Sequence, residues 1–189
     1  IVKSIILSKL GMCQKIYARK CELKKVSYEE SCQFLIDNHL QGMIGGKSTG
    51  LYYEDRLVSL LVLGSPRFDR DSDCEILRFC NRRGFSVIGG LSRLIHHIPS
   101  YSTLISYVDR RYGTGTGYAS CGMTQCSTSE PSYYYLKQGK RYNRMDFQKH
   151  KLEEKLDIFD PNLTEWQNMQ LNGYDRIWDC GTLKFSMKK

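Results

Sequence analysis

Long apolar runs are missing from this sequence of 189 residues, in which no apolar stretch exceeds four residues, as in Leu60–Leu63. A membrane-spanning helix needs about 20 such residues, so the sequence excludes a transmembrane helix. The chain also opens without the charged and apolar regions of a signal peptide. We therefore expect a soluble protein of the cytoplasm with no membrane contact. Because its first residue is isoleucine, we expect this chain to be a fragment of a longer protein.

Metal-binding motifs are missing as well. None of the eight cysteines forms a Cys-x-x-Cys pair, and Cys32, Cys74 and Cys80 lie in apolar segments, where a free thiol packs as a small hydrophobic group. The adjacent His96 and His97 point in different directions, and no histidine has the spacing of a metal ligand. We expect free thiols and no metal.

Positive charge is abundant and clustered. The 28 Lys and Arg residues exceed the 20 Asp and Glu residues, and segments 1–25, 82–111 and 137–155 carry formal charges of +6, +4 and +4. Around the start of the third segment, in Tyr133–Arg144, tyrosines stand among the basic residues, which suits phosphate neutralisation combined with base contacts. One such cluster is typical of a solvated surface, whereas three favour a surface that binds double-stranded DNA. The proposed contact residues are Arg110, Arg111, Lys137, Lys140, Arg141, Tyr142 and Arg144.

Hydrophobic periodicity and turn residues predict an α/β (α+β) chain. A linking helix is expected over 1–10, and a capping box at Ser27–Glu30 predicts a helix that runs to Gly42. The remaining expected elements are a hairpin (51–53 and 57–63), a strand (74–80), a helix from Gly89-Gly90 to Pro99, a strand (103–108), a hairpin from Ser132, a helix from Asp160-Pro161 to Asn172-Gly173, and a closing strand (176–185).

This order resembles the GNAT N-acyltransferase fold over residues 22–145. The resemblance implies a mixed central sheet with flanking helices. It favours a linker in residues 1–21 and a single GNAT-like domain in residues 22–189.

A more particular resemblance lies in Ser106–Met123, where Asp109-Arg110-Arg111 is followed by spaced glycines and Tyr118. This pattern is similar to Mom-like phage DNA-modification proteins and to the GNAT-like C-terminal domain of phage Vsr-like homing endonucleases. Residues 4–21 resemble the junction that follows the nuclease of the second group. The resemblance implies a phage-encoded protein in the host cytoplasm, DNA as the partner, and a covalently linked N-terminal nuclease module.

The segment before the central helix does not identify the cofactor. Acyl-CoA-binding members of the GNAT fold place Arg or Gln there, followed by Gly-x-Gly or Gly-x-Ala, so that backbone N–H groups bind the pyrophosphate. This chain has Ser86-Val-Ile-Gly89-Gly90-Leu91 instead, which is a poor match. Gly89 and Gly90 are therefore either a phosphate-binding turn or a tight connection from strand to helix.

Four residues are candidates for catalysis. Asp109 ends a strand and could orient an amine or accept its proton, while Arg110 or Arg111 binds phosphate; the alternative is a structural Asp–Arg pair. Tyr118 lies where GNAT-fold proteins often place a tyrosine general acid. Tyr107 and Arg78 could face a substrate cleft, unless Arg78 pairs with an acid such as Glu75.

Three functions follow from these observations. The first is a DNA-binding domain of a phage homing-endonuclease-like protein, which grips duplex DNA through clustered Lys and Arg. The second is a Mom-like transferase that modifies a DNA base. The third is an acetyl-CoA-dependent N-acetyltransferase.

Overall fold

The chain forms two compact units in the computed structural model, which describes residues 1–188. Unit 1 comprises residues 1–108, 113–127 and the segment from Leu183, and unit 2 comprises residues 109–112 and 128–182. No helix within the described residues has the length and apolar character that a membrane span requires. The expectation of a linker over 1–21 and one domain over 22–189 stays a prediction.

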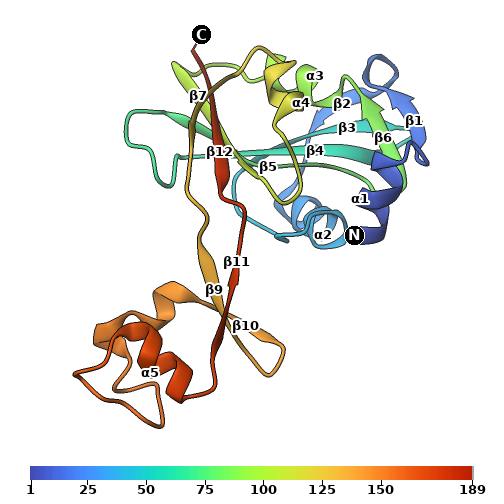
Figure 1. Cartoon of the computed structure of the whole chain (residues 1–189). Coiled ribbons are helices and arrows are strands. Elements are labelled where there is room, and N and C mark those ends of the chain that lie inside the picture. The colour runs from blue at the N-terminus through green and yellow to red at the C-terminus, as the bar shows by residue number, and fades with distance from the viewer. Residues whose placement is uncertain (189) are drawn as a thin grey trace. The chain divides into compact units, whose positions relative to one another are not determined.

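A seven-stranded sheet forms the centre of unit 1, with the strand order β2-β3-β4-β5-β7-β12-β8 (Figure 1). The pairs from β2 to β5 are antiparallel, whereas β5 and β7 are parallel, so the sheet is mixed, as predicted. Its strands are β2 (Glu22–Lys25), β3 (Lys47–Tyr53), β4 (Arg56–Gly64), β5 (Cys74–Asn81), β7 (Thr103–Asp109), β8 (Thr124–Thr128) and β12 (Thr182–Lys188).

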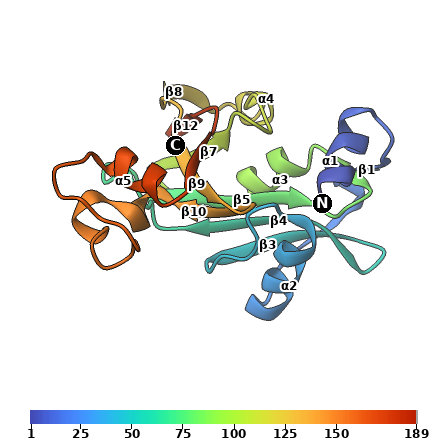
Figure 2. The same ribbon diagram turned by 60° about the horizontal axis from the view of Figure 1, so that its bottom comes forward.

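Helices cover both faces of this sheet, with α2 (Tyr28–Asn38) on one face and α3 (Gly90–His96) on the other (Figure 2). The central strand β4 is apolar on both faces because its side chains enter two separate apolar clusters. On the α2 face the buried residues are Val26, Phe34, Leu35, Leu57, Leu60 and Val62. On the α3 face they include Leu61, Ile76, Leu94, Ile95, Leu104 and Phe185.

The N-terminal cap of α2 confirms the predicted helix start, since Ser27 Oγ accepts a hydrogen bond from the backbone N–H of Glu30 at 3.2 Å. The predicted end at Gly42 is wrong. The helix ends at Asn38 because His39 adopts an extended backbone conformation, with φ −113° and ψ 132°.

A second, two-stranded sheet pairs a strand that precedes the large sheet in the chain with a strand that follows β5. The predicted linking helix is α1 (Val2–Lys9), and β1 (Gln14–Tyr17) pairs in parallel with β6 (Phe85–Ile88). Neither short strand was predicted. The 3₁₀ turn η1 (Ala18–Lys20) follows β1, and the Arg93 guanidinium of α3 donates hydrogen bonds to the carbonyls of Ala18 and, at 2.8 Å, Cys21.

Unit 2 contains a three-stranded antiparallel sheet with the order β10-β9-β11, and short helices lie in the chain between β10 and β11. Its elements are β9 (Tyr133–Lys137), β10 (Lys140–Asn143), the 3₁₀ turns η2 (Arg144–Phe147) and η3 (Lys149–Lys151), helix α5 (Glu165–Leu171) and β11 (Asp175–Trp178). The predicted hairpin from Ser132 is therefore confirmed. Its aromatic core is built around Tyr135, Phe147, Leu152 and Met169.

Two predicted boundaries in unit 2 are wrong. Helix α5 begins after Thr164 and not at Asp160-Pro161, because Thr164 and Gln167 form a capping box. The closing strand over 176–185 is two strands in different sheets, β11 and β12, which are separated by a turn at Asp179–Gly181.

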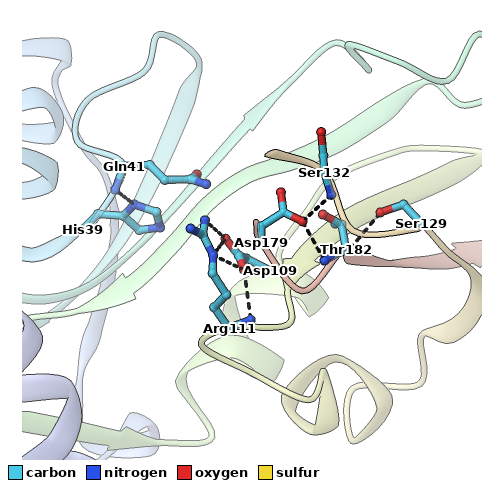
Figure 3. Close-up of polar contacts among 9 residues, drawn as sticks. His39, Gln41, Asp109, Arg111, Ser129, Ser132, Asp179 and Thr182 are labelled. Carbon is cyan, nitrogen blue, oxygen red and sulfur yellow. Dashed lines mark hydrogen bonds and ion pairs between the residues drawn. The ribbon is translucent and has the colours of Figure 1, made fainter. Parts of the chain in front are cut away.

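That turn is fixed by hydrogen bonds (Figure 3). Asp179 Oδ1 accepts from the backbone N–H groups of Ser132 and Gly181, both at 2.8 Å. Gly181 has φ +76°, and a Cβ at this position would overlap the carbonyl oxygen of Ser129. Only glycine fits at this position and readily adopts this positive φ angle. The chain therefore turns here, and β11 and β12 are separate strands.

Candidate functional site

Strands β5 and β7 separate in the middle of the unit 1 sheet. They pair only through Cys74–Ile76 and Leu104–Ser106, although both strands continue beyond these residues. Relative to β4, strand β5 has one extra residue at Leu77, which is a β-bulge that bends the strand. Beyond Ile76 and Ser106, the backbones of β5 and β7 are not joined to each other by ladder hydrogen bonds. At this opening the Leu77 carbonyl instead accepts a hydrogen bond from Arg78 Nη1.

Tyr118 lies beside the point where the strands separate. It belongs to α4 (Thr116–Ala119), stacks on Phe185 with ring centroids 5.9 Å apart, and shares a side-chain hydrogen bond with Ser106. Burial raises the pKa of the Tyr118 hydroxyl, while the hydrogen bond with Ser106 acts in the opposite direction. The hydroxyl is therefore protonated at neutral pH and is a proton donor next to the opening.

The Gly89-Gly90 turn precedes α3 on the same face. Gly89 has φ +75°, which favours glycine, and a Cβ on Gly90 would lie 3.1 Å from the Val87 side chain, which would have to shift slightly. This packing accounts for the predicted tight connection. The first N–H groups of a helix have no partner within the helix, and an added Cβ on Gly89 would meet only Ala18, at 3.9 Å. A side chain at Gly89 would thus meet little of the chain, and no basic residue stands in residues 86–91.

A buried acid lies at the start of β5. Glu75 is 0% exposed and accepts hydrogen bonds from Arg67, at 2.7 Å from Nη2, 3.1 Å from Nε and 2.9 Å from the backbone N–H. This arrangement answers one question left by the sequence, because Arg67 and not Arg78 is the partner of Glu75. The crowding of the acids of 69–75 among Arg67, Arg70 and Arg78 predicted a solvated charge network, whereas Glu75 is buried and Arg67 is its specific partner.

Tyr107 lies among the charges near this pair. Burial raises the pKa of its hydroxyl, Lys184 lowers it, and Glu75 and Asp69 raise it further. Lys184 Nζ lies 2.6 Å from Asp69 Oδ2, and its hydrogen bond is the main reason that the pKa of Asp69 falls to about 2. Tyr107 is thus a neutral phenol beside fixed charges.

Arg78 follows the bulge in β5, opposite Val62, whose side chain packs on the α2 face. Its Nη1 donates to the carbonyl of Leu77 at 2.7 Å, while its Nε is buried and finds no acceptor within residues 1–188. A buried donor without a partner is costly. Arg78 is therefore suited to bind an acceptor atom of a ligand on this side of the sheet.

His39 is held in the neutral form near Arg78. Burial and the Arg78 charge lower its pKa from the ordinary 6.5 to about 4. Its Nδ1 accepts a hydrogen bond from the backbone N–H of Gln41 at 3.1 Å, so the ring proton lies on Nε2 (Figure 3). The ring can donate from Nε2 and is a weak base at neutral pH.

This lowered pKa predicts a pH dependence of stability. Between pH 6.5 and about pH 4, unfolded His39 binds a proton and folded His39 does not, so the unfolding free energy falls as the pH falls. We expect a loss of about 2 kcal/mol from this group across that window, after allowing for its partial exposure. Urea denaturation of wild type and His39→Asn at several pH values measures it. Identical pH dependence in the two proteins would contradict this account of His39.

Asp109 and Arg111 form a close pair in unit 2 (Figure 3). Arg111 Nη2 lies 2.5 Å from Asp109 Oδ2, and the Arg111 backbone N–H donates to Oδ1 at 3.0 Å. Burial raises the pKa of Asp109, but the hydrogen bonds from Arg111 outweigh burial and lower it overall. The neighbouring Arg110 side chain is exposed, while its backbone N–H donates to Gly181. This is the structural pair that the sequence left as an alternative.

The predicted basic residues of the third charged segment lie together on the β9–β10 hairpin and the turn after it. Each cation lies over an aromatic ring. The pairs are Lys137 over Tyr174 (4.8 Å), Lys140 over Tyr142 (5.3 Å), Arg141 over Tyr134 (4.5 Å) and Arg144 over Tyr133 (4.7 Å).

Arg176 of β11 was not predicted to belong to this group. Its guanidinium lies 4.2 Å from the ring centres of both Tyr133 and Trp166. Arg176 and Trp178 are two residues apart, so they point to the same face of a strand. This spacing was the signal available in the sequence.

Within residues 1–188, no three His, Cys, Asp or Glu side chains are grouped as metal ligands. No family model and no curated protein matches the chain. Among solved structures, the chain is similar to a Bacillus subtilis acetyltransferase crystallised in complex with CoA. The match covers 90% of this chain and 99% of the other, with 14% identity and a TM-score of 0.50. The predicted GNAT-like fold is confirmed: a large mixed sheet flanked by helices.

Proposed function

We propose that this chain is an acyltransferase that uses acyl-CoA, such as acetyl-CoA, to acylate an amine. The observation that carries the proposal is the separation of β5 from β7 with the Tyr118 hydroxyl beside it. The similarity to an acetyltransferase solved with CoA supports the proposal through the fold alone.

The residues of unit 1 fit such a donor. The bulged edge of β5 after Ile76 and the facing edge of β7 offer backbone groups to an extended amide-containing chain. In this proposal the backbone N–H groups of the Gly89-Gly90 turn bind a phosphate of the donor. The turn's lack of a basic residue predicts weaker phosphate binding than an Arg or Gln at this position would give. Acyl-CoA supplies the activated acyl group as a thioester.

Each side chain has a specific task in this proposal. Tyr118 Oη, kept protonated by burial, would give its proton to the sulfur that leaves the thioester when the amine nitrogen bonds to the carbonyl carbon, and the proton lost by the amine would return to Tyr118 Oη through solvent. Arg78 Nε and His39 Nε2 offer hydrogen-bond donors on the α2 face, where they orient the second reactant. Asp109 carries no step, because its low pKa makes it a poor base and Arg111 already occupies its oxygens.

Release of free thiol from acetyl-CoA tests the proposal. The protein is mixed with acetyl-CoA and one of three amine classes: a polyamine, a lysine-rich peptide, or nucleic acid with exocyclic base amines. We expect thiol release that depends on both the protein and one of the amines. Thiol release no faster than in buffer with all three would overturn the proposal.

A second candidate is the duplex-DNA-binding domain of a phage Vsr-like homing-endonuclease-like protein, or the related Mom-like transferase that modifies a DNA base. The specific observation is the row of cations on the β9–β10 hairpin, to which Arg110 adds an exposed charge. This candidate predicts duplex binding that weakens about 1,000-fold between 50 and 200 mM salt if about six phosphates are neutralised. A duplex that does not bind even at low salt would exclude it.

A further inference from the structure

The α2 face of the unit 1 sheet is polar where β5, β7 and β12 are neighbours. Side chains alternate between the two faces along a strand. Leu104 of β7 belongs to the cluster on the α3 face, so Tyr107 points to the α2 face. Phe185 of β12 belongs to the same cluster, so its neighbour Lys184 also points to the α2 face. Arg78 of β5 points the same way, because it lies opposite a member of the α2-face cluster.

The charges near this part of the face do not balance. Glu75 is bound by Arg67, with 2.7 Å between Oε1 and Nη2. Asp69 is bound by Lys184, with 2.6 Å between Oδ2 and Nζ. Arg78 is the third cation of this group, because Arg67 and Glu75 both act on the pKa of its guanidinium. Within residues 1–188 it forms no ion pair. Three cations and two acids leave one positive charge, which lies on Arg78.

The Nε–Nη2 edge of the Arg78 guanidinium has the geometry that binds a carboxylate. Nη1 donates to the Leu77 carbonyl at 2.7 Å, whereas Nε is buried and has no acceptor within residues 1–188. Two parallel N–H donors on such an edge match the two oxygens of a carboxylate. Burial is the main reason that the pKa of Arg78 is lowered, and a bound anion would offset that cost. The residue as a whole is only partly buried, so a molecule can reach it from solvent.

The other titratable groups near Arg78 are neutral at pH 7. The pKa of His39 is lowered to about 4, and its ring proton lies on Nε2. Burial raises the pKa of the Cys80 thiol to about 12 and also raises the pKa of the Tyr107 hydroxyl. The face therefore offers one positive charge together with neutral donors. A carboxylate carries one negative charge, whereas a phosphate monoester carries more than one, so a carboxylate is the better match.

We propose that the acceptor amine carries a carboxylate, which binds the Nε–Nη2 edge of Arg78 on the α2 face of the sheet. This inference rests on the proposed acyl transfer and names its second reactant as an amino acid or a peptide with a free C-terminus. Among the three amine classes named above, only the peptide has a carboxylate. The carboxylate takes no part in bond making. The amine nitrogen bonds to the thioester carbonyl carbon, the carbon–sulfur bond breaks, and the thiol leaves with a proton.

Matched pairs of amines test this inference. Glycine, γ-aminobutyrate and Nα-acetyl-lysine each carry a carboxylate, and their amides keep the amine but lack that charge. Thiol release from acetyl-CoA is measured for every amine with the wild-type protein. We expect kcat/KM to be about tenfold or more higher for at least one acid than for its amide. Amides that react as well as their acids, or a preference for phosphoethanolamine over every acid, would overturn the inference and leave acyl transfer in place.

Two variants of Arg78 assign the carboxylate to this side chain. Arg78→Gln is expected to raise KM for the preferred acid about 10- to 100-fold and to leave KM for its amide unchanged. Arg78→Lys keeps the charge without the paired donors, so we expect a smaller rise. Arg56→Gln removes an exposed arginine at the start of β4 and is expected to change neither KM. A wild-type KM for the acid in Arg78→Gln contradicts the inference. If that variant fails to fold by circular dichroism, a wild-type KM in Arg78→Lys contradicts it.

Binding without acyl transfer separates this inference from the proposed function. The Nε–H signal of Arg78 is identified in an NMR spectrum by its loss in Arg78→Lys. It is then followed during titrations with the three acids and their amides, with and without CoA. We expect a shift of this signal with an acid and none with its amide. Such a shift together with no thiol release from any amine would overturn acyl transfer and keep the carboxylate site. No shift with any acid under either condition would overturn the carboxylate site.

Discussion

Replacing Tyr118 with phenylalanine is expected to lower the rate of acyl transfer about 100-fold or more, because a positioned general acid contributes 10²–10⁴-fold. The substitution removes one hydroxyl and keeps the ring that stacks on Phe185. The affinity for the thioester is expected to remain close to that of the wild type. Single-turnover rates and calorimetric titrations with acetyl-CoA measure the two quantities separately.

A matched control uses another tyrosine from the same cluster. Tyr53 is partly buried against the α3-face core, so Tyr53→Phe makes the same chemical change away from the strand opening. We expect its rate to equal that of the wild type. If Tyr118→Phe also keeps the wild-type rate, Tyr118 does not supply the proton and the assignment is wrong.

Arg67→Met is expected to destabilise the fold by about 3 kcal/mol, because it leaves the carboxylate of Glu75 buried with no cationic partner. The expected loss lies at the low end for buried pairs because the Arg67 side chain is 41% exposed. The Arg67 backbone N–H still donates to Glu75 in this variant. Urea denaturation at pH 7 gives the change in unfolding free energy.

The double variant distinguishes a stranded charge from a loss of packing. In the double variant Arg67→Met with Glu75→Gln, the buried side chain at position 75 is neutral. It still accepts a hydrogen bond from the backbone N–H of residue 67. We expect the double variant to be more stable than Arg67→Met alone. A double variant as unstable as Arg67→Met, or less stable, would mean that packing of the Arg67 side chain accounts for the loss.

Much of unit 1 could be predicted from the sequence, because its signals are local. The cap at Ser27, the apolar run of β4, and the glycine pair before α3 each determine an element within a few residues. The order of these elements resembles the GNAT fold, and that resemblance predicted the mixed sheet with flanking helices. The short strands β1 and β6 were missed because four residues carry little periodicity and their pairing joins distant parts of the chain.

The candidate site was predicted only in part, for physical reasons. Tyr118 was identified by resemblance, but its hydrogen bond with Ser106 depends on tertiary packing that the sequence does not show. The pair of Arg67 with Glu75 was missed because loop residues have no periodicity. The break between β11 and β12 was missed because the stretch from Arg176 to Phe185 contains strand-forming residues on both sides of a turn. The key feature of that turn is the positive φ of Gly181.

The central claim is that the opening between β5 and β7 binds a thioester. Backbone amide chemical shifts recorded by NMR during titration with acetyl-CoA test it most directly. The account predicts that the largest changes occur at Leu77–Cys80 of β5, at Tyr107–Val108 of β7 and at Gly89–Leu91. Absence of changes at saturating acetyl-CoA, or changes confined to other segments, would contradict the account.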